Sequence, residues 1–300
     1  MATALSAVTG WVLFAALIGS IGAVVGRWAL VPRAAPGPGV PRDWMERGAA
    51  RLGSAATLLL PVAMLLFFYR QLQEFRDPFA PWRDDAVLLL TGTAWGRTWL
   101  WGLAGSALAA AGTMAAGTGR RWGWWVATPA VLALGAFPAF TGHAAGEEEL
   151  RALALGADTM HVWAAGGWIG GLTLLLWLEA GWRRTSPESP ASLLPQLVPA
   201  FSPLAMVCVA ILAGTGLFAS WMHLPSVAAL YQTGYGRLLV FKLLLVAAVL
   251  ALGALNWKRL TPHLGEAGGN DALSRAASTE LLVAQLVLFV TAILVRTSPM

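Results

Sequence analysis

The stretch GADTMHVWAAGGWIGGLTLLLW, residues 156–177, decides the fold of this chain. From Trp163 onward it is almost entirely apolar, and a helix that crosses a membrane needs about 20 mostly apolar residues. Asp158 and His161 stand at its start, three residues apart, and side chains at that spacing share one face of a helix. The stretch therefore predicts a membrane-spanning helix that carries polar side chains at its mouth.

The composition extends this prediction to the whole chain. Hydrophobic residues make up 57% of the sequence and charged residues 12%, whereas soluble domains are about 25% charged. The 16 tryptophans agree, because Trp collects at membrane interfaces. We predict an all-α, polytopic integral membrane bundle of about eight transmembrane helices, near residues 5–30, 51–70, 95–116, 122–142, 155–180, 197–220, 236–257 and 276–297. We divide it into an N-terminal four-helix membrane half, 1–140, and a C-terminal membrane half, 141–300.

The distribution of positive charge predicts the topology. Loops between segments one and two, three and four, five and six, and seven and eight hold twelve Lys and Arg residues. The opposite side holds seven, and Lys242 inside the seventh segment completes the 20. Because cytoplasmic loops are enriched in Lys and Arg, both termini are predicted to lie outside. The net charge of +5 therefore reflects membrane topology, and we expect no nucleic-acid partner.

The sequence argues against several functional classes. The chain has no GxxxxGK[ST] nucleotide-binding loop, so a built-in ATPase motor is not expected. The single cysteine excludes an internal disulfide. We predict no catalytic residues and no enzymatic activity.

The predicted topology gathers three of the four histidines at the outer face, and only His263 faces the cytoplasm. Imidazole is a good ligand for copper and zinc, and the thioether of Met favours Cu(I). Asp158 is a candidate to orient the imidazole of His161 as a second-layer partner. Helix capping, packing at the interface and a solvated acidic turn at 147–149 are the structural alternatives for these groups. The candidate metal ligands are His143, His161, His223, Met160 and Met222.

Further candidates lie within the segments. Met206 and Cys208 offer sulfur to Cu(I) along a conduction path, although both residue types commonly fill buried space. Trp168 either walls the site or packs in the core. The glycine pairs at 166 and 170 and at 167 and 171 have the spacing that lets helices approach closely.

Lys242 and Glu280 lie several residues inside predicted membrane segments, where charges are rare and usually paired or functional. At 1.5 Å per residue, Lys242 and Glu280 are expected roughly 14 Å apart in depth, so we predict that they are not direct partners. Asp158 is one available partner for Lys242. Asn256, Lys258 and Arg259 are the candidates for Glu280, which is a possible cation exit or proton site.

Several segments resemble the copper resistance protein D family (CopD). HVWAAGGWIGGL at 161–172 is similar to its His-x6-Trp-x-Gly-Gly-Leu signature, and TGHAA at 141–145 resembles the end of its fourth helix. TGYGRLLVFKLLLVAAVLALGALNWKRLTP, 233–262, and STELLVAQLVLFVTAILVRTSP, 278–299, resemble its last two helices. His143 and His161 fall on the motif positions. The resemblance covers about 141–299, and the first 140 residues match in general character.

The resemblance implies a function in copper handling. A member of this family would lie in the bacterial inner (plasma) membrane, accept a copper ion at the periplasmic face and pass it inward, beside a periplasmic copper-binding partner of the CopC type. The alternative is a haem-binding, cytochrome-like electron-transfer protein, with one haem held between His143 and His161 or His223. A copper sensor or an assembly partner of an oxidase also fits the sequence.

Overall fold

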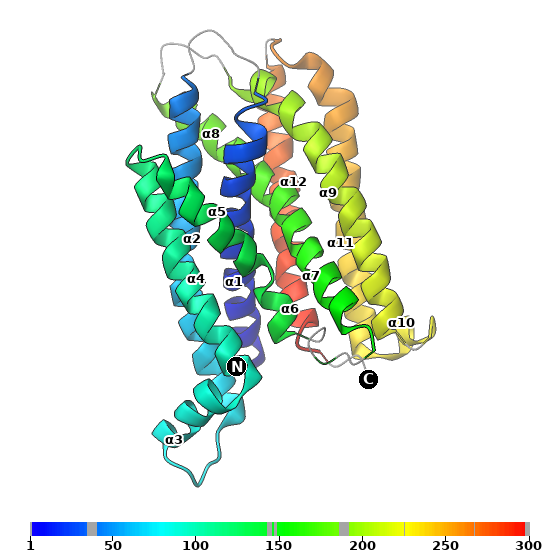
Figure 1. Ribbon diagram of the computed structural model, residues 1–300. Helices are drawn as coiled ribbons and strands as arrows, with labels where there is room; N and C mark the ends of the chain where they lie inside the picture. The colour runs from blue at the N-terminus through cyan, green and yellow to red at the C-terminus, as the bar shows by residue number, and fades with distance from the viewer. Residues whose placement is uncertain are drawn as a thin grey trace.

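The computed structural model describes residues 2–34, 41–142, 146, 149–185, 192–224, 226–266 and 268–297. Within these ranges eight helices are long and apolar enough to cross a membrane, which confirms the predicted all-α polytopic bundle (Figure 1). His143 and the acidic residues Glu147 and Glu148 lie outside the described residues.

Eight helical units follow one another through the bundle. They are α1 (Ala2–Val25) with the π-helical turn η1 (Gly26–Leu30); α2 (Arg42–Phe75); α4 (Ala94–Gly117); α5 (Trp122–Gly135) with α6 (Phe137–Thr141); α7 (Arg151–Ala165) with the π-helical turn η4 (Gly166–Gly170) and α8 (Gly171–Thr185); α9 (Leu194–His223); α11 (Gly234–Leu255) with η5 (Asn256–Leu260) and η6 (Thr261–His263); and α12 (Gly269–Leu294). Short α3 (Trp82–Val87), η2 (Leu88–Gly92) and α10 (Ala229–Gln232) precede α4 and α11.

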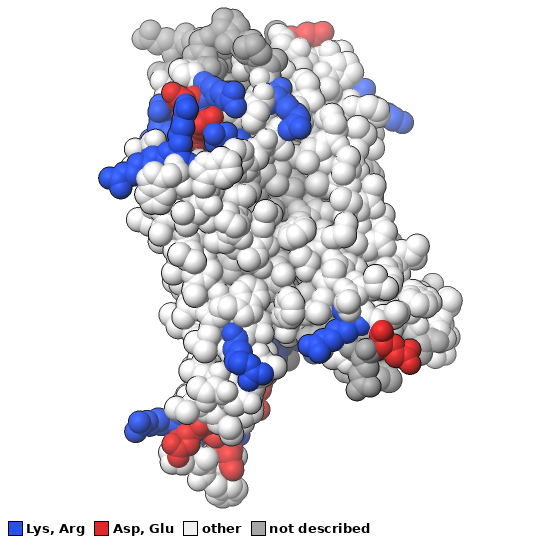
Figure 2. All heavy atoms as spheres, in the orientation of Figure 1, with Lys and Arg blue, Asp and Glu red and all other residues white. Residues whose placement is uncertain are grey.

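The centre of the bundle is built from α1 and the continuous unit α7–η4–α8. Helix α1 contacts α2, α5, α8, α12 and η4. The apolar windows of these two units are 61% and 67% buried, whereas those of α9 and α11 are 22% and 11% buried. The face shown in Figure 2 carries its charges at the two ends, with an uncharged belt between them. The chain is therefore a multi-pass membrane protein whose outer helices turn apolar side chains toward lipid.

Several helices are longer than the sequence predicted. Helix α7 begins at Arg151, because RALAL is rich in the strong helix formers Ala and Leu. His161 therefore lies about 15 Å along α7, at 1.5 Å per residue, and not at its mouth. His223 was expected in a loop, but it is the last residue of α9.

The glycines of η4, together with Gly171 at the start of α8, make the close contacts of the core. A Cβ at Gly170 would lie 2.2 Å from the carbonyl oxygen of Ile18, and one at Gly22 would lie 2.3 Å from the backbone of Gly170. A Cβ at Gly171 would meet the ring of Phe201 at 2.9 Å. Close helix approach at the glycine pairs is thus confirmed, with Gly170 against α1 and Gly171 against α9.

A buried carboxylate fixes the opposite end of this unit. Glu179, 2% exposed, accepts hydrogen bonds from Ser192 Oγ at 2.8 Å and from the backbone N–H of Leu193 at 2.7 Å. Arg183 pairs with the same carboxylate at 2.5 Å and with Asp271 of α12. This network satisfies N–H groups that the start of α9 leaves without helical partners, and it joins α8, α9 and α12.

Candidate metal site

His161 is held by a hydroxyl from the neighbouring helix. Its Nδ1 lies 2.8 Å from Oγ1 of Thr215 on α9. The Thr215 hydroxyl also lies 2.7 Å from the carbonyl oxygen of Ile211. When the hydroxyl donates its one proton to that carbonyl, it accepts from Nδ1–H of a neutral His161, whose lone pair is then on Nε2. That is the tautomer a metal ligand needs, with the other ring nitrogen bonded to a second-layer partner.

Charged side chains lie near this histidine. The charge of Lys242 on α11 acts on His161, and the charge of Asp158 acts on both Lys242 and Tyr235. Asp158 and Lys242 are both partly buried. The carboxylate offsets the positive charge of the ammonium group in a region of low dielectric constant, where an uncompensated charge is expensive.

The other predicted ligands lie elsewhere. Thr215 and His223 are eight residues apart on α9, so the ends of this segment are separated by about 12 Å. The structure therefore does not bring His161 and His223 into one coordination sphere. Met222 is partly buried beside His223 at the helix end, whereas Met160 is 47% exposed on the lipid side.

The two sulfur-containing candidates of α9 have different surroundings. Met206 is 57% exposed and turns toward lipid. Cys208 is buried, and a Cβ at Gly167 of η4 would lie 2.7 Å from its Sγ. Two residues along a helix rotate the side chain by about 200°, so the positions face opposite ways. Only Cys208 lies between α9 and the central unit.

Glu280 lies deeper in the bundle than His161 and Lys242. It is 6% exposed, accepts a hydrogen bond from Nδ2 of Asn256 at 3.0 Å and interacts with the Trp168 side chain. A Cβ at Gly253 would lie 3.3 Å from its Oε1. Trp168 therefore reaches Glu280 as well as packing in the core. Gly253 is eleven residues beyond Lys242, or about 16 Å along α11, so Lys242 and Glu280 meet different partners at different depths.

These placements put three functional groups at successive depths, and we call His161, Cys208 and Glu280 the polar ladder. Cys208 lies seven residues, or about 10 Å, deeper than Thr215 along α9. In the part of the chain that the structure describes, no group of three or more His, Cys, Asp or Glu side chains is placed to hold a metal ion. The ladder thus consists of single donor groups on different helices.

The fold and this polar interior define a polytopic membrane protein with ionisable and sulfur groups along one helical seam. A family model described as copper resistance protein D-like, N-terminal domain, matches residues 1–153, and one described as copper resistance protein D matches residues 195–294. The chain belongs to the copper resistance protein D family.

A curated relative extends the comparison. The copper transport protein CutJ of Bacillus subtilis (strain 168) is 33% identical over 116 residues, which are 38% of this chain and 20% of the relative. The chain thus aligns with about one fifth of that relative's length. No solved structure matches the chain.

Sequence reasoning missed Thr215, the residue that orients His161. A Thr in an apolar helix more often bonds only the carbonyl four residues earlier in the same helix, and Thr215 makes that contact as well. Its second role, the contact with His161, depends on α7 and α9 being neighbours, and a single sequence does not show which helices are neighbours. Glu179 was missed for the same reason, because its partners lie across a connection.

Proposed function

We propose that the chain transports copper, accepting the ion from the outer face near His161 and passing it inward along the polar ladder. The observation that carries this proposal is the contact of 2.8 Å between His161 Nδ1 and Thr215 Oγ1, which engages one ring nitrogen and leaves Nε2 to bind a metal. Membership of a copper resistance family supports copper as the substrate.

Each group of the ladder has a chemical role in this proposal. The imidazole of His161 receives copper, and the thiol of Cys208 offers a soft donor for Cu(I) farther in. Glu280 releases the ion toward the inner end or exchanges a proton for it, because a carboxylate binds copper less firmly than sulfur does. Transport needs sites that bind well enough to admit the ion and weakly enough to release it.

Lys242 requires an explanation in a cation path. Its charge would repel copper, but Asp158 lies close enough to neutralise it. When Asp158 is engaged in this way, the positive charge near His161 is reduced and the approach of a cation costs less. Asp158 and Lys242 together therefore set the electrostatic cost of bringing a copper ion to His161.

Further parts of the proposal concern the surroundings of the chain. We propose location in the bacterial inner membrane, both termini outside, and delivery of copper by a periplasmic protein of the CopC type. His143 remains a proposed ligand next to His161, since it occupies the matching motif position. His223 and Met222 are proposed as a first contact for copper at the end of α9, about 12 Å before His161.

The alternative of a haem-binding protein keeps only one of its two candidate histidine pairs. A bis-histidine haem needs two imidazoles on opposite sides of one iron, and His161 and His223 are too far apart along the bundle for this. A pair of His143 and His161 remains as the haem hypothesis, and a Soret band in the purified protein is its test.

The decisive experiment measures copper in wild type and variants. We expect purified His161→Ala and the double variant His143→Ala, His161→Ala to lose bound copper by metal analysis and to lose uptake in vesicles. Met160→Leu is the matched control, because that neighbouring side chain faces lipid. Full copper stoichiometry in a folded double variant would place the site elsewhere.

A further inference from the structure

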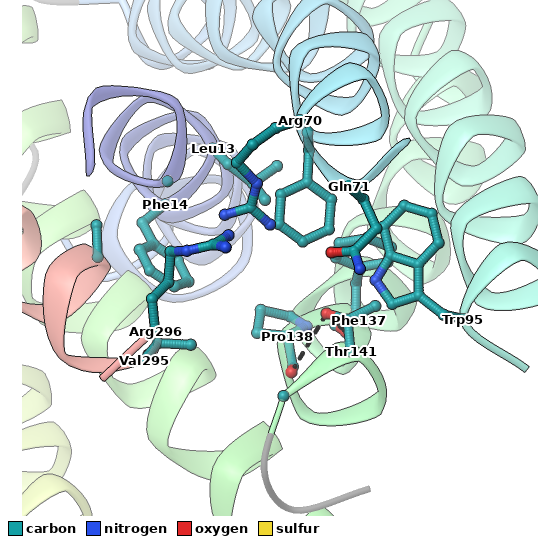
Figure 3. A pocket seen from close by; sticks show the side chains of 14 residues that line it. Leu13, Phe14, Arg70, Gln71, Trp95, Phe137, Pro138, Thr141, Val295 and Arg296 are labelled. Atoms are coloured by element: carbon teal, nitrogen blue, oxygen red, sulfur yellow. Dashed lines mark hydrogen bonds between the residues drawn. The ribbon is translucent and has the colours of Figure 1, made fainter. Parts of the chain in front are cut away.

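A polar cavity lies apart from the polar ladder, at the end of the bundle that carries both termini. It has a volume of about 310 Å³ and is formed by α1, α2, α4, α6 and the end of α12. We call it the arginine pocket, and its lining includes Arg70, Arg296, Gln71, Trp95, Phe67 and Phe137. Figure 3 shows the guanidinium groups of Arg70 and Arg296 directed toward one another across it.

Two guanidinium groups that converge in a partly buried space repel each other unless an anion lies between them. Glu74 pairs with Arg296 and supplies one negative charge. Arg70 donates from Nη1 to Ser6 Oγ at 3.2 Å, and its guanidinium lies 4.6 Å from the centre of the Phe67 ring. These partners carry no charge, so among the residues that the structure describes the pocket keeps a net positive charge of one.

The hydrogen-bonding capacity of the pocket is also unfilled. Nε of Arg70 is buried and has no hydrogen-bond partner among the described residues. The amide of Gln71 and the indole of Trp95 add donors to the lining. Burial lowers the pKa of Arg296, which shows that its charge is poorly solvated. All of these groups favour a ligand that carries several oxygen atoms as hydrogen-bond acceptors.

The size and position of the pocket narrow the class of ligand. A volume of 310 Å³ equals that of roughly ten water molecules, so the pocket takes more than a bare halide ion. Arg70 lies five residues before the end of α2, and Arg296 lies two residues beyond the end of α12. Both are thus near the membrane surface, where lipid phosphates lie, and the rings of Phe67 and Phe137 suit an apolar neighbour of such a group.

We propose that the arginine pocket binds the phosphate of one anionic ligand, carried on a lipid headgroup or present as free inorganic phosphate. Phosphate offers more acceptor oxygens than a carboxylate does, and the planar fork of Arg binds it in a bidentate manner. The site is independent of copper transport, because it shares no residue with the polar ladder.

The test uses the purified full-length chain in neutral detergent. Native mass spectrometry with phosphatidylglycerol and phosphatidylcholine measures lipid binding. Thermal unfolding in sodium phosphate and in sodium chloride at equal ionic strength measures the free ion. We expect one phosphate-bearing ligand per chain, and an affinity lowered about tenfold or more in Arg70→Gln, because a charge-assisted hydrogen bond is lost.

Two further variants make the result specific. Arg97→Gln removes an exposed arginine at the same end of the bundle and should leave binding unchanged. Glu74→Gln removes the competing carboxylate and should raise the affinity, which a folding defect would not do. Preferential retention of phosphatidylglycerol identifies a lipid as the source, and stabilisation by phosphate alone identifies the free ion. Binding of neither probe, or equal loss in Arg97→Gln and Arg70→Gln, overturns the proposal.

Discussion

At the scale of single residues, the proposed site depends on which ring nitrogen of His161 carries the proton. The Thr215 hydroxyl lies near both Nδ1 of His161 and the carbonyl oxygen of Ile211. If the hydroxyl gives its one proton to Ile211, it accepts from Nδ1–H of His161, and the lone pair of the neutral ring is on Nε2. The proposed copper chemistry then depends on Thr215, a residue that does not itself bind the metal.

This dependence gives a prediction for Thr215. Thr215→Val keeps the shape of the side chain but removes the acceptor, so both tautomers of His161 become accessible and its orientation is lost. We expect copper affinity to fall about 10- to 100-fold, the range typical for loss of such a partner. Competition with a copper chelator measures it. Thr215→Ser retains the hydroxyl and should keep affinity near that of the wild type; an equal loss in both variants would contradict the hydrogen-bond argument.

At the scale of the elements, the glycines of η4 determine how closely three helices pack. Gly170 touches the backbone of α1, whereas Gly167 and Gly171 face Cys208 and Phe201 of α9. The π-helical turn rotates the chain between these contacts, and such turns often occur at functional sites. The same turn places Trp168 against Glu280. Packing and the inner end of the polar ladder thus rest on one segment.

The crossing of α1 and η4 should not tolerate a side chain. In Gly170→Ala the new Cβ would overlap backbone atoms that cannot move aside, so we expect a loss of about 1–3 kcal/mol in the free energy of unfolding. Unfolding in a mixed detergent measures it. Gly214→Ala is the control, since nothing lies within 4 Å of a Cβ there; a stable Gly170→Ala variant would show that the crossing can open.

The sequence alone predicted the helices and the close approach of the glycines because both follow from local pattern. Length and hydropathy fixed eight spans, and the four-residue spacing at 166–171 indicated packing. Helix ends were predicted less well. Helix α7 begins at Arg151, about one turn before the predicted start at 155, because the strong helix formers of RALAL continue it. His161 therefore lies about one turn farther along its helix than predicted.

The side-chain partners of the site could be predicted only in part. The different depths of Lys242 and Glu280 followed from residue counting along antiparallel helices, and Asn256 was among the partners expected for Glu280. Thr215 and the arginine pocket depend on which helices are neighbours. Arg70 and Arg296 are 226 positions apart in the chain, and no periodicity connects them.

At the scale of the whole molecule, orientation in the membrane decides the direction of transport. Twelve Lys and Arg residues lie toward one side of the spans predicted from the sequence and seven toward the other, which predicts that the richer side is cytoplasmic. The proposed entrance at His161 lies nearer the side with fewer Lys and Arg residues, where α9 ends and the segment before α4 projects (Figure 1). Copper would then enter the polar ladder from outside.

Cysteine labelling tests this orientation. In a Cys208→Ala background, Phe79→Cys, at a position 97% exposed in the loop after α2, should react with a membrane-impermeant maleimide in intact spheroplasts. Arg120→Cys, in the connection between α4 and α5, should react only after permeabilisation. The reason is the excess of positive charge that retains the Arg120 side in the cytoplasm. The reverse pattern would place His161 near the cytoplasm, and the same ladder would then carry copper outward, since its order of donors is fixed by the fold.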